Sequence, residues 1–118
     1  MNKLNYFLLL LVLSATSHVV SATGYSVNGL SISYIRVVGD YPGTVYDNSI
    51  ELHFAAIAWP EGSSCSGVRV YIDADNSHMV SAAYAAYIAG MTVDIYADDA
   101  LPMRGPNCEL SYMDINKP

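Results

Sequence analysis

Basic residues are scarce in this chain, and lysine is absent from residues 4–116. Five lysines and arginines stand against eleven aspartates and glutamates among 118 residues, so the formal net charge is -6. A nucleic-acid-binding domain carries a basic face, so this charge balance excludes that class of protein. The gap in lysine also excludes a lysine nucleophile and a phosphate-loop lysine within the fold.

Charged residues of either sign are few, at 14% of the chain, whereas 53% of the residues are hydrophobic and ten are tyrosines. A disordered segment has a high charge and few aromatic residues, so the composition predicts a folded chain with a hydrophobic core. The length fits one domain and is short for two.

An apolar run at the N-terminus has the anatomy of a secretory signal peptide. A short cationic start precedes the run over residues 6–13, and Ala22 ends a small-residue cleavage motif. A run this short cannot span about 30 Å of hydrocarbon at about 1.5 Å per residue, which argues against a membrane anchor. We predict a signal peptide over residues 1–22, with cleavage after Ala15 as the alternative. The mature chain, residues 23–118, is then a single exported domain, periplasmic or secreted, without a membrane span.

Only two cysteines are present, Cys65 and Cys108, and both follow the predicted cleavage site. In an oxidising compartment an isolated pair of cysteines forms a disulfide. The bridge would close a loop of about 43 residues and stabilise the fold by about 4 kcal/mol on the chain-entropy model. The competing interpretation, a pair of metal ligands, lacks histidines or further cysteines nearby.

Alternating apolar residues predict five strands. The first strand is predicted over residues 30–38, and apolar residues on both faces near its end indicate a bend or burial on both sides. Its predicted buried face consists of Leu30, Ile32, Tyr34 and Val38. The other strands are predicted over residues 50–56, 68–72, 91–96 and 108–115.

A change of period predicts one helix over residues 78–89, which hold five alanines and neither glycine nor proline. Asp75, Asn76 or Ser77 is the candidate N-cap, and Gly90 stands where a C-terminal glycine belongs. The order β-β-β-α-β-β is that of the OB-fold, a five-stranded Greek-key barrel with its helix between strands three and four. An open α+β sheet and a sandwich are the alternatives, but closure of the barrel removes vulnerable edges.

The predicted helix carries no aspartate, glutamate, lysine or arginine on any side. The side chains predicted to face the barrel are Met79, Val80, Ala83, Ala86 and Tyr87. Tyr84 and Ile88 are then left on other sides of the helix. An uncharged surface helix is expected to be covered by a loop or by another subunit. A homo-oligomer formed through residues 78–89 and a monomer both remain open.

Two acidic groups are candidate cation sites. Residues 73–77 have the D-x-D-x-S opening of a calcium loop, but His78 and Tyr84 stand where glycine and glutamate are needed. A turn that leads into a helix N-cap explains the same residues. The second candidate site lies at the end of the fourth strand and consists of Asp94, Asp98 and Asp99. A solvated loop is the alternative interpretation of these three residues.

No sequence motif indicates catalysis. The chain has no G-x-S-x-G motif, and the two cysteines are expected to be oxidised. His53 and His78 lack the spacing of paired metal ligands. We therefore predict a non-enzymatic protein with no catalytic residues, no metal and no cofactor.

The outward face of the first three strands is the candidate ligand face, because OB-folds bind ligands there. Tyrosine can stack on a sugar, serine can hydrogen-bond its hydroxyls and arginine can pair with a carboxylate. Trp59 is the predicted exposed aromatic anchor, and Glu51 lies on the same face as the other candidates. The candidate binding residues are Ser31, Ser33, His53, Trp59, Arg69 and Tyr71. A solvated strand face with a packing tryptophan is the alternative.

Several features together resemble a toxin family. They are the signal peptide, Gly29 before an isoleucine-rich strand, Cys65 before VRVYI, a helix ending in AGMTV, and CELSY from Cys108. This layout is similar to the B subunits of subtilase-cytotoxin-like and pertussis-like toxins and to related uncharacterised exported bacterial proteins. The resemblance implies an OB-fold and a pentamer that binds cell-surface glycans and carries a separate A subunit. It assigns no individual binding residue.

The sequence therefore predicts an exported, disulfide-linked binding domain. Its sharper form is a toxin-B-like oligomer, with a cell-surface glycan, further copies of itself and a separate A-type subunit as partners. The alternative is a small periplasmic or envelope protein that acts through protein–protein contacts and has no glycan ligand. An enzyme is the third choice.

Overall fold

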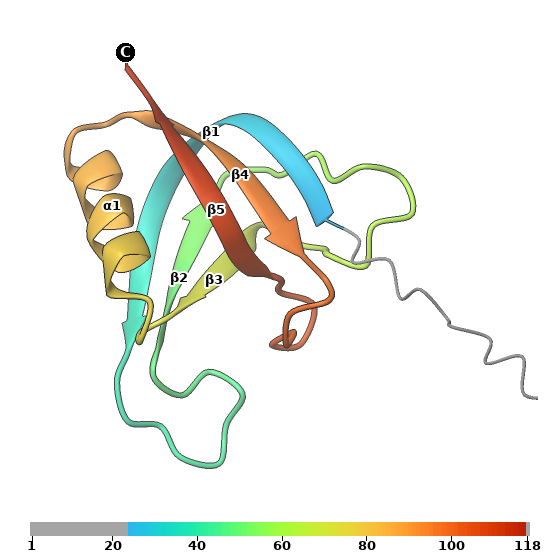
Figure 1. The fold of residues 1–118 in the computed structure, drawn as a ribbon, viewed down its shortest axis with the longest axis vertical. Coiled ribbons are helices and arrows are strands. Elements are labelled where there is room, and N and C mark those ends of the chain that lie inside the picture. The colour runs from blue at the N-terminus through green and yellow to red at the C-terminus, as the bar shows by residue number, and fades with distance from the viewer. Residues whose placement is uncertain (1–23, 118) are drawn as a thin grey trace, which may run out of the picture.

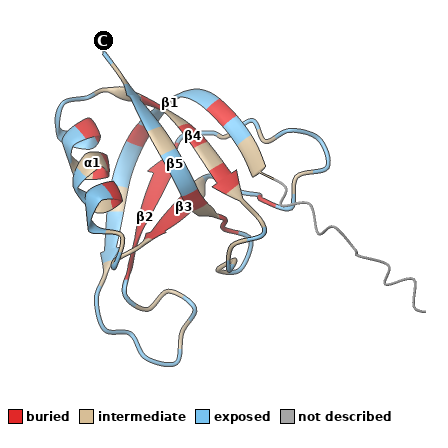
Figure 2. Ribbon diagram, in the orientation of Figure 1, coloured by how far each residue is buried: buried red, intermediate tan, exposed pale blue. Residues whose placement is uncertain are grey.

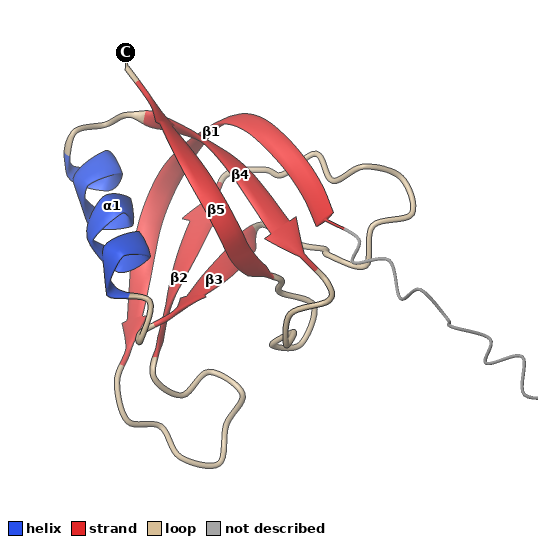
Figure 3. Ribbon diagram, in the orientation of Figure 1, coloured by secondary structure: helices blue, strands red, loops and turns tan. Residues whose placement is uncertain are grey.

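A computed structural model describes residues 24–117 of the chain. The predicted signal peptide and both candidate cleavage sites lie outside the described residues. The described part contains five strands and one helix in the predicted order (Figures 1 and 3). They are β1 (Gly24–Val38), β2 (Ser49–Phe54), β3 (Arg69–Asp73), α1 (Ser77–Ile88), β4 (Thr92–Asp98) and β5 (Glu109–Asn116). No helix in this part is long and apolar enough to cross a membrane.

The five strands form one sheet that closes on itself in the order β1-β2-β3-β5-β4. Four of the five contacts between neighbouring strands are antiparallel. The fifth contact, between β3 and β5, is parallel and consists of the single pair Tyr71 and Glu109. The mostly-β class and the position of the helix are thus confirmed, and the sheet is closed where an open sheet or a sandwich was the alternative.

The hydrophobic core fills the inside of the ring, as period-two alternation predicts. Ile50, Leu52 and Phe54 of β2 point inward, and alternate residues of β3 and β4 join them. β2 is buried on both faces, along its whole length (Figure 2). Other residues of the protein therefore cover the outer face of β2, and this cover limits where a ligand could bind on that face.

β1 begins at Gly24, six residues before the predicted start, and it pairs with two other strands. Its first half pairs with β4 and its second half pairs with β2. The register shifts between Ile32 and Tyr34, which leaves Ser33 as an extra residue. Such a bulge resets the alternation, so Ile35 packs on the core and Tyr34 lies outside. The predicted inward position of Tyr34 is therefore wrong.

α1 packs against β1 and β5 through the buried Met79, Ala83 and Ala86. Tyr84 packs against the core from the middle turn, whereas Tyr87 in the last turn is exposed. The two tyrosines thus exchange their predicted positions, because the residues that line one side of this helix are set by the shape of the sheet beneath it. An almost uniformly apolar helix offers no polar face from which to predict that side.

Both ends of α1 are defined by backbone contacts. Asn76 is the N-cap, but its side chain makes no capping hydrogen bond. Gly90 has a φ of 65° and donates its N–H to the Tyr87 carbonyl, while the N–H of Met91 donates to the Ala86 carbonyl. This pair of bonds is the Schellman motif, and it confirms the predicted role of Gly90.

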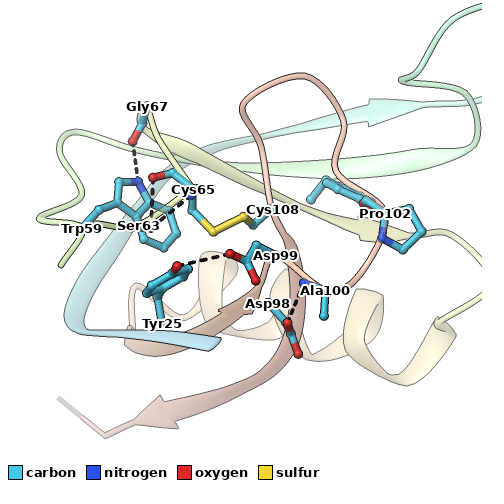
Figure 4. The surroundings of a disulfide bond; sticks show 11 residues. Tyr25, Trp59, Ser63, Cys65, Gly67, Asp98, Asp99, Ala100, Pro102 and Cys108 are labelled. Carbon is cyan, nitrogen blue, oxygen red and sulfur yellow. Dashed lines mark hydrogen bonds between the residues drawn. A yellow bond between two sulfur atoms is a disulfide. The ribbon is translucent and has the colours of Figure 1, made fainter. Parts of the chain in front are cut away.

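Cys65 and Cys108 form the predicted disulfide (Figure 4). Both residues are buried, and their Cα atoms are 5.5 Å apart. The bond links the loop before β3 to the residue that precedes β5. The disulfide therefore lies beside the contact between β3 and β5, at which the sheet closes.

Candidate ligand-binding face

Two rows of side chains cross the outside of β1, β2 and β3. Cross-strand pairing places Tyr34, His53 and Arg69 in one row. The neighbouring row consists of Arg36, Glu51, Tyr71 and Glu109. Side chains opposite one another on one face of a sheet come within contact distance, so the register brings charges and aromatic rings together here.

Glu51 is the centre of this face and is almost completely buried, with 1% of the residue exposed. Its Oε2 atom accepts a hydrogen bond from Arg36 Nη1 at 3.1 Å. The same oxygen lies 3.2 Å from His53 Nε2 and 3.5 Å from Arg69 Nη1. A buried carboxylate needs such partners, since it loses the solvation of water. The three partners come from both neighbouring strands and from β2 itself.

Tyr34 covers the buried His53. The two rings stack with centroids 4.1 Å apart and an interplanar angle of 16°. His53 is buried, whereas Tyr34 is 45% exposed. One face of the Tyr34 ring is therefore held by the histidine, and the phenol is presented at the surface in a fixed orientation. We refer to Tyr34, Arg36, Glu51, His53 and Arg69 as the Glu51 cluster.

Two loops cover the remainder of the face. The 39–48 loop places the Tyr46 ring against Arg69, with the guanidinium carbon 5.8 Å from the ring centroid. The 99–107 loop contributes Asn107, whose Oδ1 accepts a hydrogen bond from Arg69 Nε at 3.2 Å. The outer side chains of β2 are covered by their neighbours, because Tyr34 stacks on His53, both Arg36 and Arg69 contact Glu51, and the Ser49 hydroxyl donates to the Tyr46 carbonyl.

Arg104 of the 99–107 loop organises the covered end of the face. Its guanidinium lies over the Tyr71 ring at 4.5 Å, and Nη2 is 3.4 Å from Oδ2 of Asp73. Its Nη1 donates to the Asp47 carbonyl in the other loop at 2.8 Å. One side chain thus holds both loops against the end of β3.

Tyr71 is locked into this covered end. Its hydroxyl donates to the Pro102 carbonyl and also lies 3.3 Å from Oε2 of Glu109. Burial raises the pKa of Tyr71 to about 12, and the charge of Glu109 acts in the same direction. Burial also raises the pKa of the Glu109 carboxyl above its usual value. Tyr71 is consequently a structural hydrogen-bond donor at neutral pH.

The six candidate residues from the sequence do not all gather at one place. His53 and Arg69 meet in the Glu51 cluster, and Tyr71 lies under the 99–107 loop. Ser31 and Ser33 are exposed on β1, where Ser31 pairs with Thr92 of β4.

Trp59 is only partly exposed. Its ring packs against the core, and its Nε1 donates to the Gly67 carbonyl at 3.0 Å (Figure 4). The indole therefore stabilises the loop that contains Cys65. It is not the exposed aromatic anchor that the sequence predicted.

Four residues that shape this face were missed by the sequence reasoning. They are Tyr34, Arg36, Tyr46 and Asn107. For Tyr34 and Arg36 a signal existed, because the apolar Ile35 between them marks the change of alternation. For Tyr46 and Asn107 no local signal exists, since loops 39–48 and 99–107 meet only in the folded chain.

The two candidate cation sites become hydrogen-bonded turns and separate contacts. Asp73 Oδ1 accepts the Asp75 N–H, which forms the turn into α1. At the other site the three carboxylates face different partners: Asp94 accepts from Gly29 and Asn116, Asp98 from Ala100, and Asp99 from Tyr25. No cluster of histidine, cysteine and acidic residues within residues 24–117 could hold a metal ion.

Comparison with known proteins returns no match to a family model, to a curated protein or to a solved structure.

Proposed function

We propose that this protein is an exported, non-enzymatic OB-fold domain that binds an acidic glycan on the outside of β1, β2 and β3. The observation that carries the proposal is the exposed Tyr34 ring, fixed by His53 and bordered by Arg36. OB-folds bind oligosaccharides on the face of strands two and three and on the loops after strands one and four. The Glu51 cluster and the 39–48 and 99–107 loops occupy the corresponding positions.

The chemistry of the face suits a sugar that carries a carboxylate. The free face of Tyr34 can stack on the apolar side of a sugar ring. The Arg36 side chain is 51% exposed and uses one nitrogen for Glu51, so its other donors can bind a carboxylate. Two arginines against one glutamate give the cluster a local positive charge in a chain whose net charge is -6. An anionic ligand would therefore be drawn to this cluster.

The proposal extends to the toxin-B-like role as its sharpest form. A glycan-binding domain of this kind would deliver a separate A-type subunit, and it would act as an oligomer. The order of the strands supports the OB-fold on which this comparison depends.

The test is calorimetric titration with glucuronate, with glucose as the neutral control. Tyr34→Ala is expected to weaken glucuronate binding by at least about fivefold, which corresponds to ~1 kcal/mol of stacking. Arg36→Gln removes one of the two positive charges of the cluster and should weaken glucuronate binding more than glucose binding.

The matched control is Tyr112→Ala. Tyr112 is a similarly exposed tyrosine that stacks on Tyr96, but it lies on β5. Affinity that is unchanged in Tyr34→Ala, or lost equally in Tyr112→Ala, would contradict the proposed face. Trp59→Ala and Tyr71→Ala are unsuitable tests because both residues support the fold.

A second candidate function, binding of a protein partner, is favoured by the outer side of α1. Ile88 is 84% exposed, and Tyr87 next to it is exposed as well. Exposed large apolar side chains on one helix fit a protein contact, including contact with further copies of this chain. Light scattering discriminates: an oligomer that dissociates in Ile88→Glu supports this contact, and a monomer that binds no sugar and no protein contradicts both candidates.

A further inference from the structure

Asn107 has a buried hydrogen-bond donor without an acceptor. The residue is 1% exposed, and its Nδ2 has no hydrogen-bond partner among residues 24–117. A buried polar group left in this way destabilises the fold, and such groups are rare in native proteins. A ligand that supplies an acceptor would remove this destabilisation.

Arg69 fixes the orientation of the Asn107 amide. The guanidinium group only donates hydrogen bonds, so the atom 3.2 Å from Arg69 Nε must be the amide oxygen. The reversed amide would place two donors against each other. The unpaired atom is therefore the NH₂ group, and it can be satisfied only by an acceptor.

Arg69 also connects Asn107 to the proposed ligand face. Its Nη1 contacts Glu51 and its Nε contacts Asn107, whereas its Nη2 makes no hydrogen bond or ion pair within residues 24–117. Unused donors thus remain on two side chains that are bonded to each other. A carboxylate matches them, since it only accepts and carries the opposite charge to the guanidinium.

The 39–48 and 99–107 loops both contact Arg69, whose side chain remains 28% exposed. Tyr46 lies against Arg69 from one loop, and Arg104 of the other loop bonds to the Asp47 carbonyl and to Asp73. The described part of the chain contains no pocket. Because Asn107 is 1% exposed, a ligand reaches its NH₂ group only after the surrounding loop moves.

We propose that the ligand face continues beneath the two loops to Asn107, whose free NH₂ group, together with Arg69, binds the carboxylate of an acidic sugar. Tyr34 and Arg36 form the exposed entrance to this face, and Arg69 and Asn107 form its closed end. The inference rests on the proposed function and adds a defined group for the ligand carboxylate.

The first test follows the Asn107 side chain directly. The exported protein, labelled with ¹⁵N, is titrated with glucuronate and with glucose. Glucuronate is expected to shift the Asn107 NH₂ resonances and the backbone resonances of both loops at the same saturation point, and glucose is expected to leave Asn107 unchanged. Saturable glucuronate binding without a change at Asn107 would overturn this inference and leave the proposed function in place. Absence of binding by either sugar contradicts both.

The second test is Asn107→Asp, which removes the NH₂ donor and keeps an oxygen for Arg69 Nε. The affinity for glucuronate is expected to fall more than about tenfold, as for a lost hydrogen bond to a charged group. The control is Asn28→Asp, which adds the same charge at an exposed position on the half of β1 that pairs with β4. Its affinity should stay within about twofold of the unmodified protein. Equal losses of glucuronate affinity in both variants would overturn the inference. If Asn107→Asp does not fold, the ¹⁵N titration of the unmodified protein decides whether Asn107 binds the ligand.

Discussion

Glu51 shows how a single residue can organise the candidate face. It lies on the outside of a sheet, where carboxylates normally meet water, yet it is 1% exposed and its carboxylate is surrounded by Arg36, His53 and Arg69. Its charge neutralises one of two arginines and leaves the other as excess positive charge. Glu51 thus orients both guanidinium groups and neutralises only one of them.

Glu51→Gln is expected to lower the free energy of unfolding by about 1.5 kcal/mol. The amide keeps the shape of the buried side chain but removes the charge that holds the partly exposed Arg36 and Arg69. Urea denaturation measures the change. Asp114→Asn on β5 removes an exposed carboxylate and should stay within about 0.5 kcal/mol of the unmodified protein. Equal stability of the two variants would contradict the structural role of Glu51.

Tyr71 makes stability depend on pH in the alkaline range. Its pKa rises from 10.0 in the unfolded chain to about 12 in the fold, because of burial first and of Glu109 second. Between these values the unfolded chain releases the phenol proton while the folded chain keeps it, so rising pH lowers the free energy of unfolding. This contribution is complete below pH 10.0 and is lost as the pH approaches about 12.

Tyr71→Phe should therefore lose less stability than the unmodified protein when the pH rises from about 9 to about 11. Tyr112→Phe removes an exposed phenol and serves as the control. Urea denaturation at both pH values provides the measurement. If the free energy of unfolding of Tyr71→Phe falls as steeply with pH as that of the control, Tyr71 does not contribute to the loss of stability at alkaline pH.

At the scale of the helix and the strands, the features that depend on residues adjacent in sequence were predictable. Four strands and α1 lie within two residues of their predicted ranges, because alternation, Ala content and Gly90 are local signals, whereas β1 begins six residues earlier than predicted. The bulge at Ser33 was not predictable in position, since a register shift depends on how β1 divides its pairing between β2 and β4. That shift turned Tyr34 and Arg36 outward and so defined half of the candidate site.

At the C-terminal end of α1, Gly90→Ala is expected to cost about 1 kcal/mol of stability. Gly90 has a φ of 65°, and an added Cβ would meet nothing within 4 Å, so the cost comes from the backbone conformation alone. Gly39→Ala is the matched control, because its Cβ would also enter open space but its φ is not in the left-handed region. Thermal unfolding of both variants checks this, and an equal effect would contradict the role of the Schellman motif.

On the scale of the whole molecule, the class of fold and the disulfide were predictable, whereas the covered part of the candidate face was not. Two cysteines leave one pairing, and five short strands with one helix limit the architecture. The contact between the 39–48 and 99–107 loops joins segments far apart in sequence through Arg104 and a backbone carbonyl. No periodicity records such a contact.

Reduction of the Cys65–Cys108 bond is expected to lower the free energy of unfolding by about 4 kcal/mol. The bond closes a loop with a sequence separation of 43 residues, and its loss increases the entropy of the unfolded chain. Thermal unfolding with and without a reductant, and of the Cys65→Ala/Cys108→Ala double variant, gives the measurement. A melting temperature that is insensitive to both changes would contradict a stabilising role for the bond.

The closure of the sheet has a consequence for how the protein opens. β3 and β5 share one residue pair, supported by a hydrogen bond from the Tyr71 N–H to the Cys108 carbonyl, whereas every other strand contact is an extended antiparallel ladder. Local unfolding therefore begins most easily between β3 and β5. Because the disulfide stands at that junction, the two strands stay tethered when they part, and each opening is followed by closure in the same register.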